Sequence, residues 1–423
     1  MKKRMYLCID LKSFYASVEC VERGFDPMTT NLIVADPERS EKTICLAVTP
    51  AMKALGVKNR CRVFEIPKSI EYIMAEPRMQ KYIDYAAEIY AIYLKFVSKD
   101  DIHVYSIDEV FVDVTDYLSL YGMTAKELGI KMMTEVFEKL GIRATCGVGT
   151  NLYLAKVALD ITAKHSSDFV GMLDEETYCK TLWTHRPITD FWRIGRGTAR
   201  RLESMGIYDM GGITRCNEEY LYKKFGIDAE LLIDHAWGRE PVTMADIKNY
   251  KPKSNCLTSG QVLMCDYGFE DGRIIVKEMM ELLCLDMVEK GLVTKSITLY
   301  VGYSNTLNME PARGSAAVDI PTNADSQLVP LAAELYGRIV NPLHPIRRVN
   351  ISCNGVTEEK KEYVQLSLFD DSTEKEKSRK IQNAIIGIKK QFGKNAVFKG
   401  IDLGENATTL ERNRQIGGHK SGG

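Results

Sequence analysis

Short apolar runs alternate with longer amphipathic stretches over the first 170 residues of the chain. The run 5–9 predicts a strand that ends at Asp10, and the pattern from Ser13 to about Arg23 predicts a helix with Ser13 as its N-cap. Continuing the pattern predicts further strands at 32–35, 43–48 and 144–148, and further helices at 50–55, 79–98, 124–139 and from about Asn151 through Lys164. This alternation favours a fold that mixes helices and sheets.

Residues 102–114 predict a β-hairpin with Asp108 and Glu109 close to its bend. Consecutive residues of a regular strand point to opposite faces, but at a bend both carboxylates can reach one place. Asp10, at the end of a neighbouring strand, can join them. Three converging acids repel one another unless cations lie among them, so the pattern indicates a divalent-metal site suited to phosphoryl transfer.

The pattern changes after Pro187. The stretch 191–207 predicts a short helix, a glycine turn and a second helix, which resembles a helix-hairpin-helix motif. Such a turn can bind a DNA phosphate through its backbone N–H groups, although simple helix packing explains the pattern equally well. Gly147-x-Gly149 is likewise either a weak phosphate-binding signal or a tight strand-to-helix turn.

The second half of the chain predicts a linker at 240–255 and then a two-layer domain. Its predicted elements are a helix near 269–290, a strand at 295–303, a strand near 315–319, a helix near 324–340 and a strand at 347–355. A further helix is expected at 378–392.

Composition narrows the class of protein. A chain of 423 residues is too long for one core, and its 45% hydrophobic content is typical of a soluble protein. The apolar run that follows the basic N-terminus stops at Asp10, which is too short for a signal peptide, and no run is long enough to span a membrane. Eleven cysteines without a Cys-x-x-Cys pair indicate reduced thiols, so we expect a cytoplasmic location.

Charge gives little support for nucleic-acid binding by itself. The formal net charge is −1, whereas many nucleic-acid binders carry an excess of Lys and Arg. Residues 373–423 hold 11 basic and 5 acidic side chains, an excess of 6 positive charges that is also typical of an ordinary solvated surface.

Several motifs, in their order along the chain, resemble the Y-family DNA polymerases that copy damaged templates. The motifs are Asp10 with Phe14-Tyr15-Ala16-Ser17-Val18-Glu19, the stretch 46–57, Tyr105-Ser106-Ile107-Asp108-Glu109-Val110-Phe111, and Gly147-Val148-Gly149 through Leu154-Ala155-Lys156. The resemblance covers residues 5–355 and is strongest to the bacterial UmuC/DinB-like branch. The ending 416–419 is similar to that of Firmicute members.

The resemblance implies a multidomain α+β fold shaped like a right hand. Palm and fingers would span 1–170, with the fingers inserted at about 20–77, and a helical thumb would span 171–240. A linker at 241–250 would lead to an α/β little-finger domain at 251–355, followed by a C-terminal tail at 356–423.

The resemblance also implies the site and its chemistry, which is primer extension with dNTPs at a site that holds two Mg²⁺ ions. Asp10, Asp108, Glu109 and the backbone carbonyl of Leu11 would bind the ions. The expected nucleotide-binding residues are Phe14, Tyr15 as the steric gate against ribose, Lys53 and Lys164. Gly195, Gly197 and Arg200 would contact primer-template DNA.

The chain departs from the family pattern at two points. Lys164 lies one residue further from Asp160 than in some relatives. Many relatives carry Tyr and Arg where this chain has Pro50 and Lys53. Lysine is a point charge without the bidentate fork of arginine, so the grip on the triphosphate is expected to differ.

A short apolar cluster flanked by charges suggests a protein partner. The peptide Gln365-Leu366-Ser367-Leu368-Phe369 resembles the clamp-binding motif of bacterial polymerases, in which Gln365, Leu366, Leu368 and Phe369 would contact the sliding clamp. We expect a monomeric catalytic subunit that is nucleoid-associated when it acts.

Two other functions remain open at the level of sequence. A nucleotide cyclase also uses a palm-like domain with two metals, but it would lack the thumb, the little finger and the clamp peptide. A catalytically weak or inactive accessory protein of the mutagenesis and repair machinery would lack acids of the trio, and here all three are present.

Overall fold

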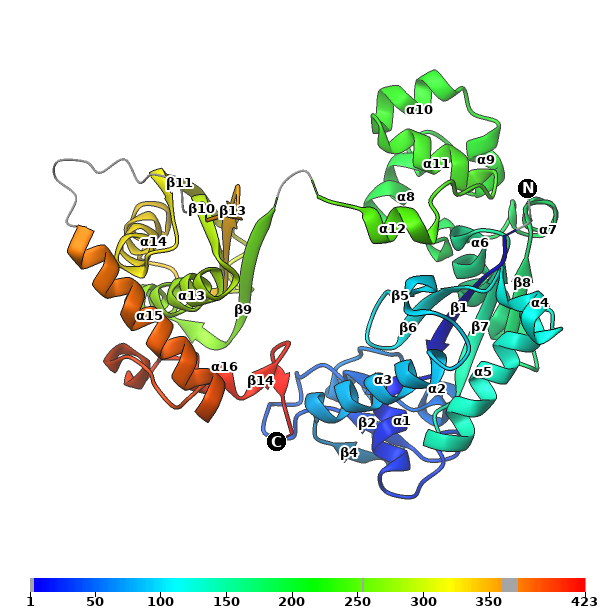
Figure 1. Ribbon diagram of the computed structural model, residues 1–423, viewed down its shortest axis with the longest axis horizontal. Coiled ribbons are helices and arrows are strands. Elements are labelled where there is room, and N and C mark those ends of the chain that lie inside the picture. Colours follow the sequence, from blue (N-terminus) through cyan, green and yellow to red (C-terminus); the bar gives the residue numbers. More distant parts are fainter. Residues whose placement is uncertain (1–3, 253–254, 360–371, 423) are drawn as a thin grey trace. The chain divides into compact units, whose positions relative to one another are not determined.

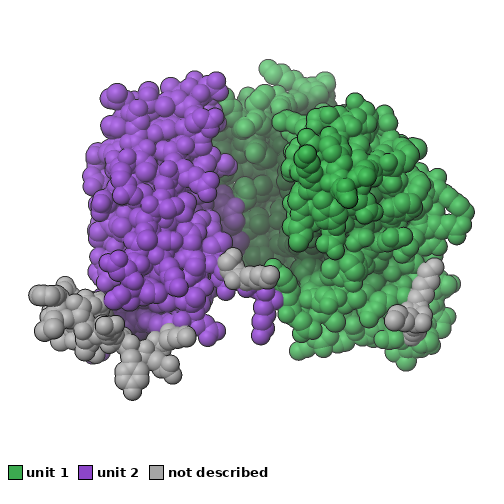
Figure 2. All heavy atoms as spheres, turned by 90° about the horizontal axis from the view of Figure 1, so that it is seen from above, with its two compact units in different colours: residues 1–250, 419–423 green, residues 251–418 purple. Residues whose placement is uncertain are grey.

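The computed structural model describes residues 4–252, 255–359 and 372–422. The chain forms two compact units, one of residues 1–250 with 419–423 and one of residues 251–418 (Figures 1 and 2). Among the helices in the described ranges, none has both the length and the apolar character that crossing a bilayer requires.

A five-stranded sheet organises the first unit. Its order is β5 (Ile102–Val104), β6 (Glu109–Asp113), β1 (Tyr6–Leu11), β7 (Ala144–Gly149) and β8 (Val170–Leu173). The central strand β1 is antiparallel to both of its neighbours. It is apolar on successive positions because helices cover both faces of the sheet. Helix α5 (Ala125–Leu140) packs on the face that carries Leu7, and α6 (Leu152–Val157) packs on the face that carries Cys8.

Two glycines allow α6 to lie directly on the sheet. A Cβ atom on Gly147 would be 2.0 Å from the carbonyl oxygen of Ala155, and one on Gly149 would be 2.1 Å from the amide nitrogen of the same residue. Both glycines belong to β7 itself. The Gly-x-Gly pattern therefore serves helix-on-strand packing, and the strand-to-helix turn comes after it.

The helix predicted at 124–139 is confirmed as α5, and other predicted helices of the first unit are shorter or less regular in the structure. The helix expected at 79–98 is α3 (Met79–Tyr93), and α1 covers Phe14–Val21. The helix expected through Lys164 changes after α6 into the π-helical turn η3 (Ala158–Thr162) and the 3₁₀ turn η4 (Ala163–His165). Two short elements, η2 (Lys99–Asp101) and α4 (Tyr117–Tyr121), complete this part.

A small sheet is inserted between α1 and α3, in the order β3 (Ala47–Val48), β2 (Leu32–Val34) and β4 (Ile73–Ala75). It packs with α2 (Pro50–Ala54) and the 3₁₀ turn η1 (Val63–Glu65) around a separate core that contains Ile33, Val48 and Met52. The strand predicted at 43–48 is thus limited to β3, and β4 is an addition to the predicted elements.

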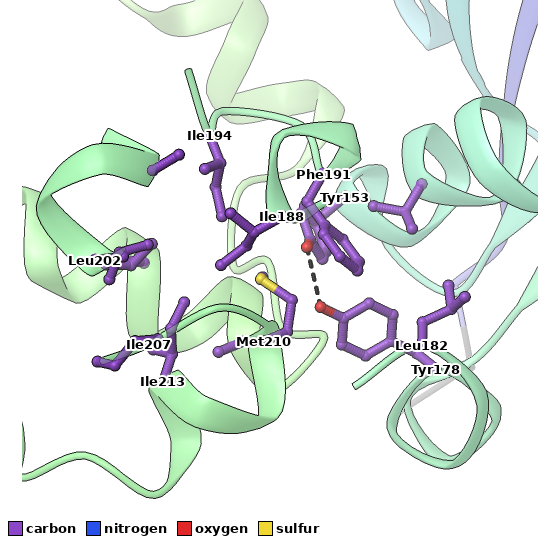
Figure 3. Close-up of a cluster of buried hydrophobic side chains, with 14 of the residues drawn as sticks. Tyr153, Tyr178, Leu182, Ile188, Phe191, Ile194, Leu202, Ile207, Met210 and Ile213 are labelled. Atoms are coloured by element: carbon purple, nitrogen blue, oxygen red, sulfur yellow. Dashed lines mark hydrogen bonds between the residues drawn. The ribbon is translucent and has the colours of Figure 1, made fainter. Parts of the chain in front are cut away.

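A helical region follows β8. It consists of α7 (Glu175–Leu182), η5 (Ile188–Asp190), α8 (Arg196–Glu203), α9 (Met210–Thr214), α10 (Glu218–Phe225) and α11 (Asp228–Ala236). Its core gathers Phe191, Leu202 and Met210, as Figure 3 shows. The Tyr153 and Tyr178 hydroxyls, 3.1 Å apart, join α6 to α7 within this core.

The linker predicted around 241–250 is wrong for most of these residues, which form α12 (Met244–Asn249). Thr243 and Asp246 form a capping box at its start, and Met244 is 2% exposed against the core that contains Tyr6. Lys248 Nζ donates to the Ile102 carbonyl at 2.7 Å. The prolines and charges that suggested a linker flank a capped helix whose apolar side is buried.

The second unit contains an antiparallel sheet in the order β11 (Ala312–Thr322), β10 (Leu292–Tyr303), β12 (Ile346–Asn354) and β9 (Cys256–Tyr267). Helices α13 (Phe269–Lys290) and α14 (Asp325–Ile339) form its second layer, and β13 (Thr357–Glu358) pairs with β10. The predicted elements are present, and β9 adds a strand that the pattern did not indicate.

Residues 372–418 fold onto this second unit instead of forming a loose tail. They contain α15 (Ser372–Phe392), η6 (Gly400–Leu403), α16 (Thr409–Asn413) and β14 (Gln415–Ile416), and β15 (His419–Lys420) follows. Glu278 of α13, 1% exposed, accepts hydrogen bonds from the backbone N–H groups of Thr408 and Thr409 at 3.0 and 3.2 Å. The predicted helix at 378–392 is confirmed, with an earlier start.

Candidate active site

Strand pairing brings Asp10 and Glu109 together where β1 ends and β6 begins, with Asp108 next to Glu109 in the chain. Asp10 of β1 lies directly opposite Glu109 of β6, and paired residues of antiparallel strands have Cα atoms about 4.5–5.5 Å apart. The backbone N–H of Leu11 donates to the carbonyl of Asp108 at 2.9 Å, which fixes the bend against the end of β1. The hairpin prediction is confirmed.

The carboxylates have partners of their own. Asp108 Oδ1 accepts from the Ser106 hydroxyl at 2.6 Å, whereas Glu109 accepts from the Cys8 thiol at 3.2 Å and from Lys156 Nζ at 2.9 Å. Lys156 also lies 3.1 Å from Asp160 Oδ1. With the side chains in these positions, no three His, Cys, Asp or Glu side chains of the described residues form a group that could hold a metal ion.

The electrostatics of the trio favour added positive charge. Burial, together with the charges of Asp108 and Glu109, raises the pKa of Asp10 to about 7. Burial works against the charged amine of Lys156, but the neighbouring Cys8, Asp160 and Glu109 outweigh it and raise the pKa of Lys156. Carboxylate oxygens are the ligand type that hard divalent cations prefer.

The charges of Asp10 and of Lys164 in η4 both act on Lys53 of α2. Burial and the charge of Lys164 lower the pKa of Lys53, while Asp10 acts in the opposite direction. Lys12, which the sequence pattern did not single out, also has a lowered pKa because of burial and the charge of Lys53.

Tyr15 is half-buried, whereas Phe14 is buried. Burial and the charge of Asp108 raise the pKa of Tyr15, while the charge of Arg60 acts in the opposite direction. The ring stacks on Tyr82 with centroids 4.5 Å apart and an interplanar angle of 16°. Phe14 is 3% exposed, so its side chain is part of the core and only its backbone is available to a nucleotide.

The start of α1 has no side-chain cap. Ser13 occupies the N-cap position with φ 49°, but its side chain caps no amide, contrary to the prediction. Its hydroxyl is buried and has no hydrogen-bond partner among the described residues. An uncapped helix N-terminus with a buried hydroxyl beside it is suited to phosphate oxygens.

The predicted DNA-contact residues lie at the start of α8. Gly195 is its N-cap without a side-chain cap, and a Cβ atom on Gly195 or Gly197 would meet open space. Arg200 is exposed on the same helix. The first helix of the predicted motif is reduced to η5, so the resemblance to a helix-hairpin-helix rests on the turn and on α8.

The pattern did not assign Lys156 to the site, although its side chain pairs with Glu109. Its spacing of four from Asp160 on a helix was the available signal, because such pairs face each other. The predicted clamp-binding residues, Gln365, Leu366, Leu368 and Phe369, lie outside the described residues.

The chain matches a known protein family and is similar to known bacterial proteins. Residues 9–160 match the impB/mucB/samB family, and residues 266–368 match the C-terminal domain of the same family. The chain is 29% identical to the putative UV-damage repair protein UvrX of Bacillus subtilis (strain 168), covering 99% of this chain and 98% of that protein. It is 28% identical to DNA polymerase IV 2 of the same organism, covering 99% of both.

A solved structure agrees at the level of fold. The chain is similar to a Y-family DNA polymerase chimera, Dbh-Dpo4(243-245)-Dbh, with a TM-score of 0.62, 20% identity, and coverage of 84% of this chain and 99% of that one. The chain belongs to the impB/mucB/samB family, within the UmuC/DinB-like bacterial branch of the Y-family DNA polymerases.

Proposed function

We propose that the chain is a template-directed DNA polymerase that extends primers with dNTPs by two-metal nucleotidyl transfer and acts at damaged templates. The observation that carries the proposal is the pairing of Asp10 with Glu109 beside Asp108, in a chain whose two family domains are both present. A nucleotide cyclase does not account for the second family domain. An inactive accessory protein does not account for three retained acids.

In this proposal Asp10, Asp108, Glu109 and the Leu11 carbonyl bind Mg²⁺. Bound there, the ions supply the Lewis acidity that activates the primer 3′-hydroxyl and neutralises the leaving pyrophosphate. Lys53, Lys164 and the open start of α1 hold the triphosphate, and the Tyr15 ring lies against its sugar. The two glycines of the α8 turn and Arg200 contact DNA phosphates without reading sequence.

We further assign palm with inserted fingers to 1–170, thumb to 171–240 and little finger to 251–355. This assignment follows the family order of the two matched domains. We propose that the protein is a monomer, acts in the cytoplasm and joins the nucleoid when it synthesises DNA.

Primer extension tests the proposed function. The purified full chain, a primed template with or without a lesion, Mg²⁺ and each dNTP singly should give addition of the complementary nucleotide on the intact template and bypass of at least one lesion. Absence of any templated addition would refute the polymerase assignment. Addition on intact DNA with arrest at every lesion would refute only the specialisation.

Replacing Tyr15 with Ala should raise ribonucleotide incorporation by about 100-fold or more, since a lost clash with the 2′-hydroxyl is worth a few kcal/mol of discrimination. Tyr15→Phe keeps the ring and should keep the discrimination. The measurement is the ratio of kcat/KM for a dNTP and its rNTP. Equal ratios in the parent and in Tyr15→Ala would contradict the steric-gate role.

Replacing Leu368 and Phe369 with Ala should abolish capture of the chain by immobilised bacterial sliding clamp, because apolar anchors of this kind carry most of the affinity of a peptide for a groove. Tethering by the clamp raises the effective concentration at the primer end, so clamp-stimulated extension should also be lost. Extension without the clamp serves as the control and should be unchanged. Capture that survives both substitutions would place the clamp contact elsewhere.

A further inference from the structure

The segment 419–422 folds onto the first unit of the structure. Lys420 Nζ lies 3.4 Å from Asp36 Oδ1 and 2.7 Å from Glu38 Oε2, and it also forms an ion pair with Glu76. These acids flank the small sheet that is inserted between α1 and α3. One lysine thus bridges three carboxylates that would otherwise repel one another more strongly.

The same segment caps a helix. The N-cap position of α3, Arg78, provides no side-chain hydrogen bond, and the first amides of a helix have no partner within it. The backbone N–H of Gln80 donates to the carbonyl of Ser421 at 2.9 Å and so gains a partner from outside α3. Gly422 has φ +78°, and a Cβ atom on it would lie 2.6 Å from Arg78 Cβ and 2.7 Å from Arg78 Cα. Only glycine permits this approach.

Arg78 connects the segment to Glu19 and Tyr82, the residues that support the ring of Tyr15. Its Nε and Nη2 donate to the two carboxylate oxygens of Glu19, each at 2.9 Å. Glu19 is fully buried and also accepts from the Tyr82 hydroxyl at 2.8 Å. The ring of Tyr82 is the one on which Tyr15 stacks. Close packing of Gly422 on Arg78, hydrogen bonds through Glu19 and one ring contact therefore form a path from Gly422 to Tyr15.

We propose that the segment 419–422 determines sugar specificity: it fixes Arg78, and Arg78 with Glu19 holds Tyr82 and hence the plane of Tyr15. Lys420 and Gly422 are positioning residues, because they touch neither substrate nor the reacting atoms. This inference rests on the proposed function, since it needs Tyr15 to act as the gate.

The carboxylate of Glu19 explains why the position of Arg78 matters. Burial of Glu19 opposes its ionisation, but hydrogen bonds from Arg78, Arg23 and Tyr82 prevail and lower the pKa of Glu19. A bidentate arginine fixes a carboxylate in one plane more firmly than a single donor does. If Arg78 shifts, Glu19 loses the plane in which it receives the Tyr82 hydroxyl, and the ring above it is free to tilt.

The test compares Gly422→Ala and Lys420→Ala with the parent, using the ratio of kcat/KM for a dNTP and its rNTP. Discrimination should fall by about 2- to 30-fold, the range by which residues along a physical coupling path modulate a distant site. The change should come from a lower KM for the rNTP, while extension with the dNTP stays within about twofold. Lys420→Arg keeps the charge and should restore discrimination.

Matched controls separate this effect from general loosening. Gly393→Ala puts backbone strain on a glycine with φ +95° and open space around it, and Lys394→Ala removes an exposed lysine elsewhere in the chain. Neither should change sugar discrimination. In a Tyr15→Ala background, adding Gly422→Ala should have no further effect, because the ring that the segment positions is already absent.

Hydrogen exchange at the Gln80 amide reports whether the segment has been released. Faster exchange together with unchanged discrimination would overturn the inference. Unchanged exchange in both variants and in a chain lacking 419–423 would overturn it as well, since the contact would then not hold α3. If Tyr15→Ala itself leaves discrimination unchanged, the gate assignment fails. If Tyr15→Ala lowers sugar discrimination but the 419–422 variants leave it unchanged, the role of Tyr15 is supported and only this inference fails.

Discussion

Replacing Asp108 with Asn is expected to lower single-nucleotide extension by more than about 100-fold while the fold and DNA binding survive. Loss of groups that merely support a metal ligand costs about 10- to 100-fold, so loss of a ligand charge should cost more. Asp108 is the informative member of the trio, because its side chain accepts only from the Ser106 hydroxyl among the described contacts. Removing its charge leaves no buried cation unpaired.

Extension kinetics measure the loss of nucleotide addition, and fluorescence anisotropy on the same primed template measures the retained DNA binding. Asp100→Asn is a matched control, since Asp100 is an exposed acid just before the same hairpin and should leave extension unchanged. An Asp108→Asn variant whose extension rate stays within tenfold of the parent would remove Asp108 from the metal site. A variant that also loses DNA binding would point to a folding defect instead.

Replacing Lys156 with Met is expected to lower the free energy of unfolding by about 3–5 kcal/mol, the cost of breaking a buried ion pair by removing one partner. The side chains of Lys156 and Glu109 are each only 10% exposed, so water cannot replace the lost charge. Lys180→Met is the matched control, because its pair with Glu176 is 69% and 74% exposed and should contribute less than about 1 kcal/mol.

Denaturant unfolding with and without Mg²⁺ checks this prediction. Without Lys156, Glu109 and Asp160 lose their shared cation next to Asp10, so added Mg²⁺ should stabilise Lys156→Met more than it stabilises the parent. A loss of stability below about 1 kcal/mol would show that the pair is not maintained in solution. Equal stabilisation by Mg²⁺ in both proteins would separate Lys156 from the metal site.

The parts of the site that could be predicted from the sequence are those carried by local pattern. Asp10, Asp108 and Glu109 stand next to short apolar runs, and apolar runs of strand length limit where a backbone can lie. Their register follows from antiparallel pairing, which leaves few arrangements once both strands are buried. Helix α13 follows in the same way, because its predicted range agrees with Phe269–Lys290.

The remaining features depend on contacts between distant segments. Lys156 is one lysine among many until α6 is packed on the sheet opposite Glu109. Ser13 has the usual identity of an N-cap, yet its left-handed backbone turns the hydroxyl away from the helix amides. Helix α12 was hidden because prolines and charges dominate its surroundings, while its burial depends on a core formed almost entirely by earlier residues.

The bare backbone of β7 has a consequence for how this enzyme can vary. Because Gly147 and Gly149 have no side chains, the backbone of α6 packs directly on the backbone of β7. This short distance between helix and strand allows Lys156 to reach Glu109. A methyl group at either glycine would overlap the backbone of α6 and push the helix away from the strand. The ammonium group of Lys156 would then move away from Glu109 and Asp160. Gly147 and Gly149 take no part in the chemistry, but sequence variants that replace either of them are therefore not expected to keep the active site intact.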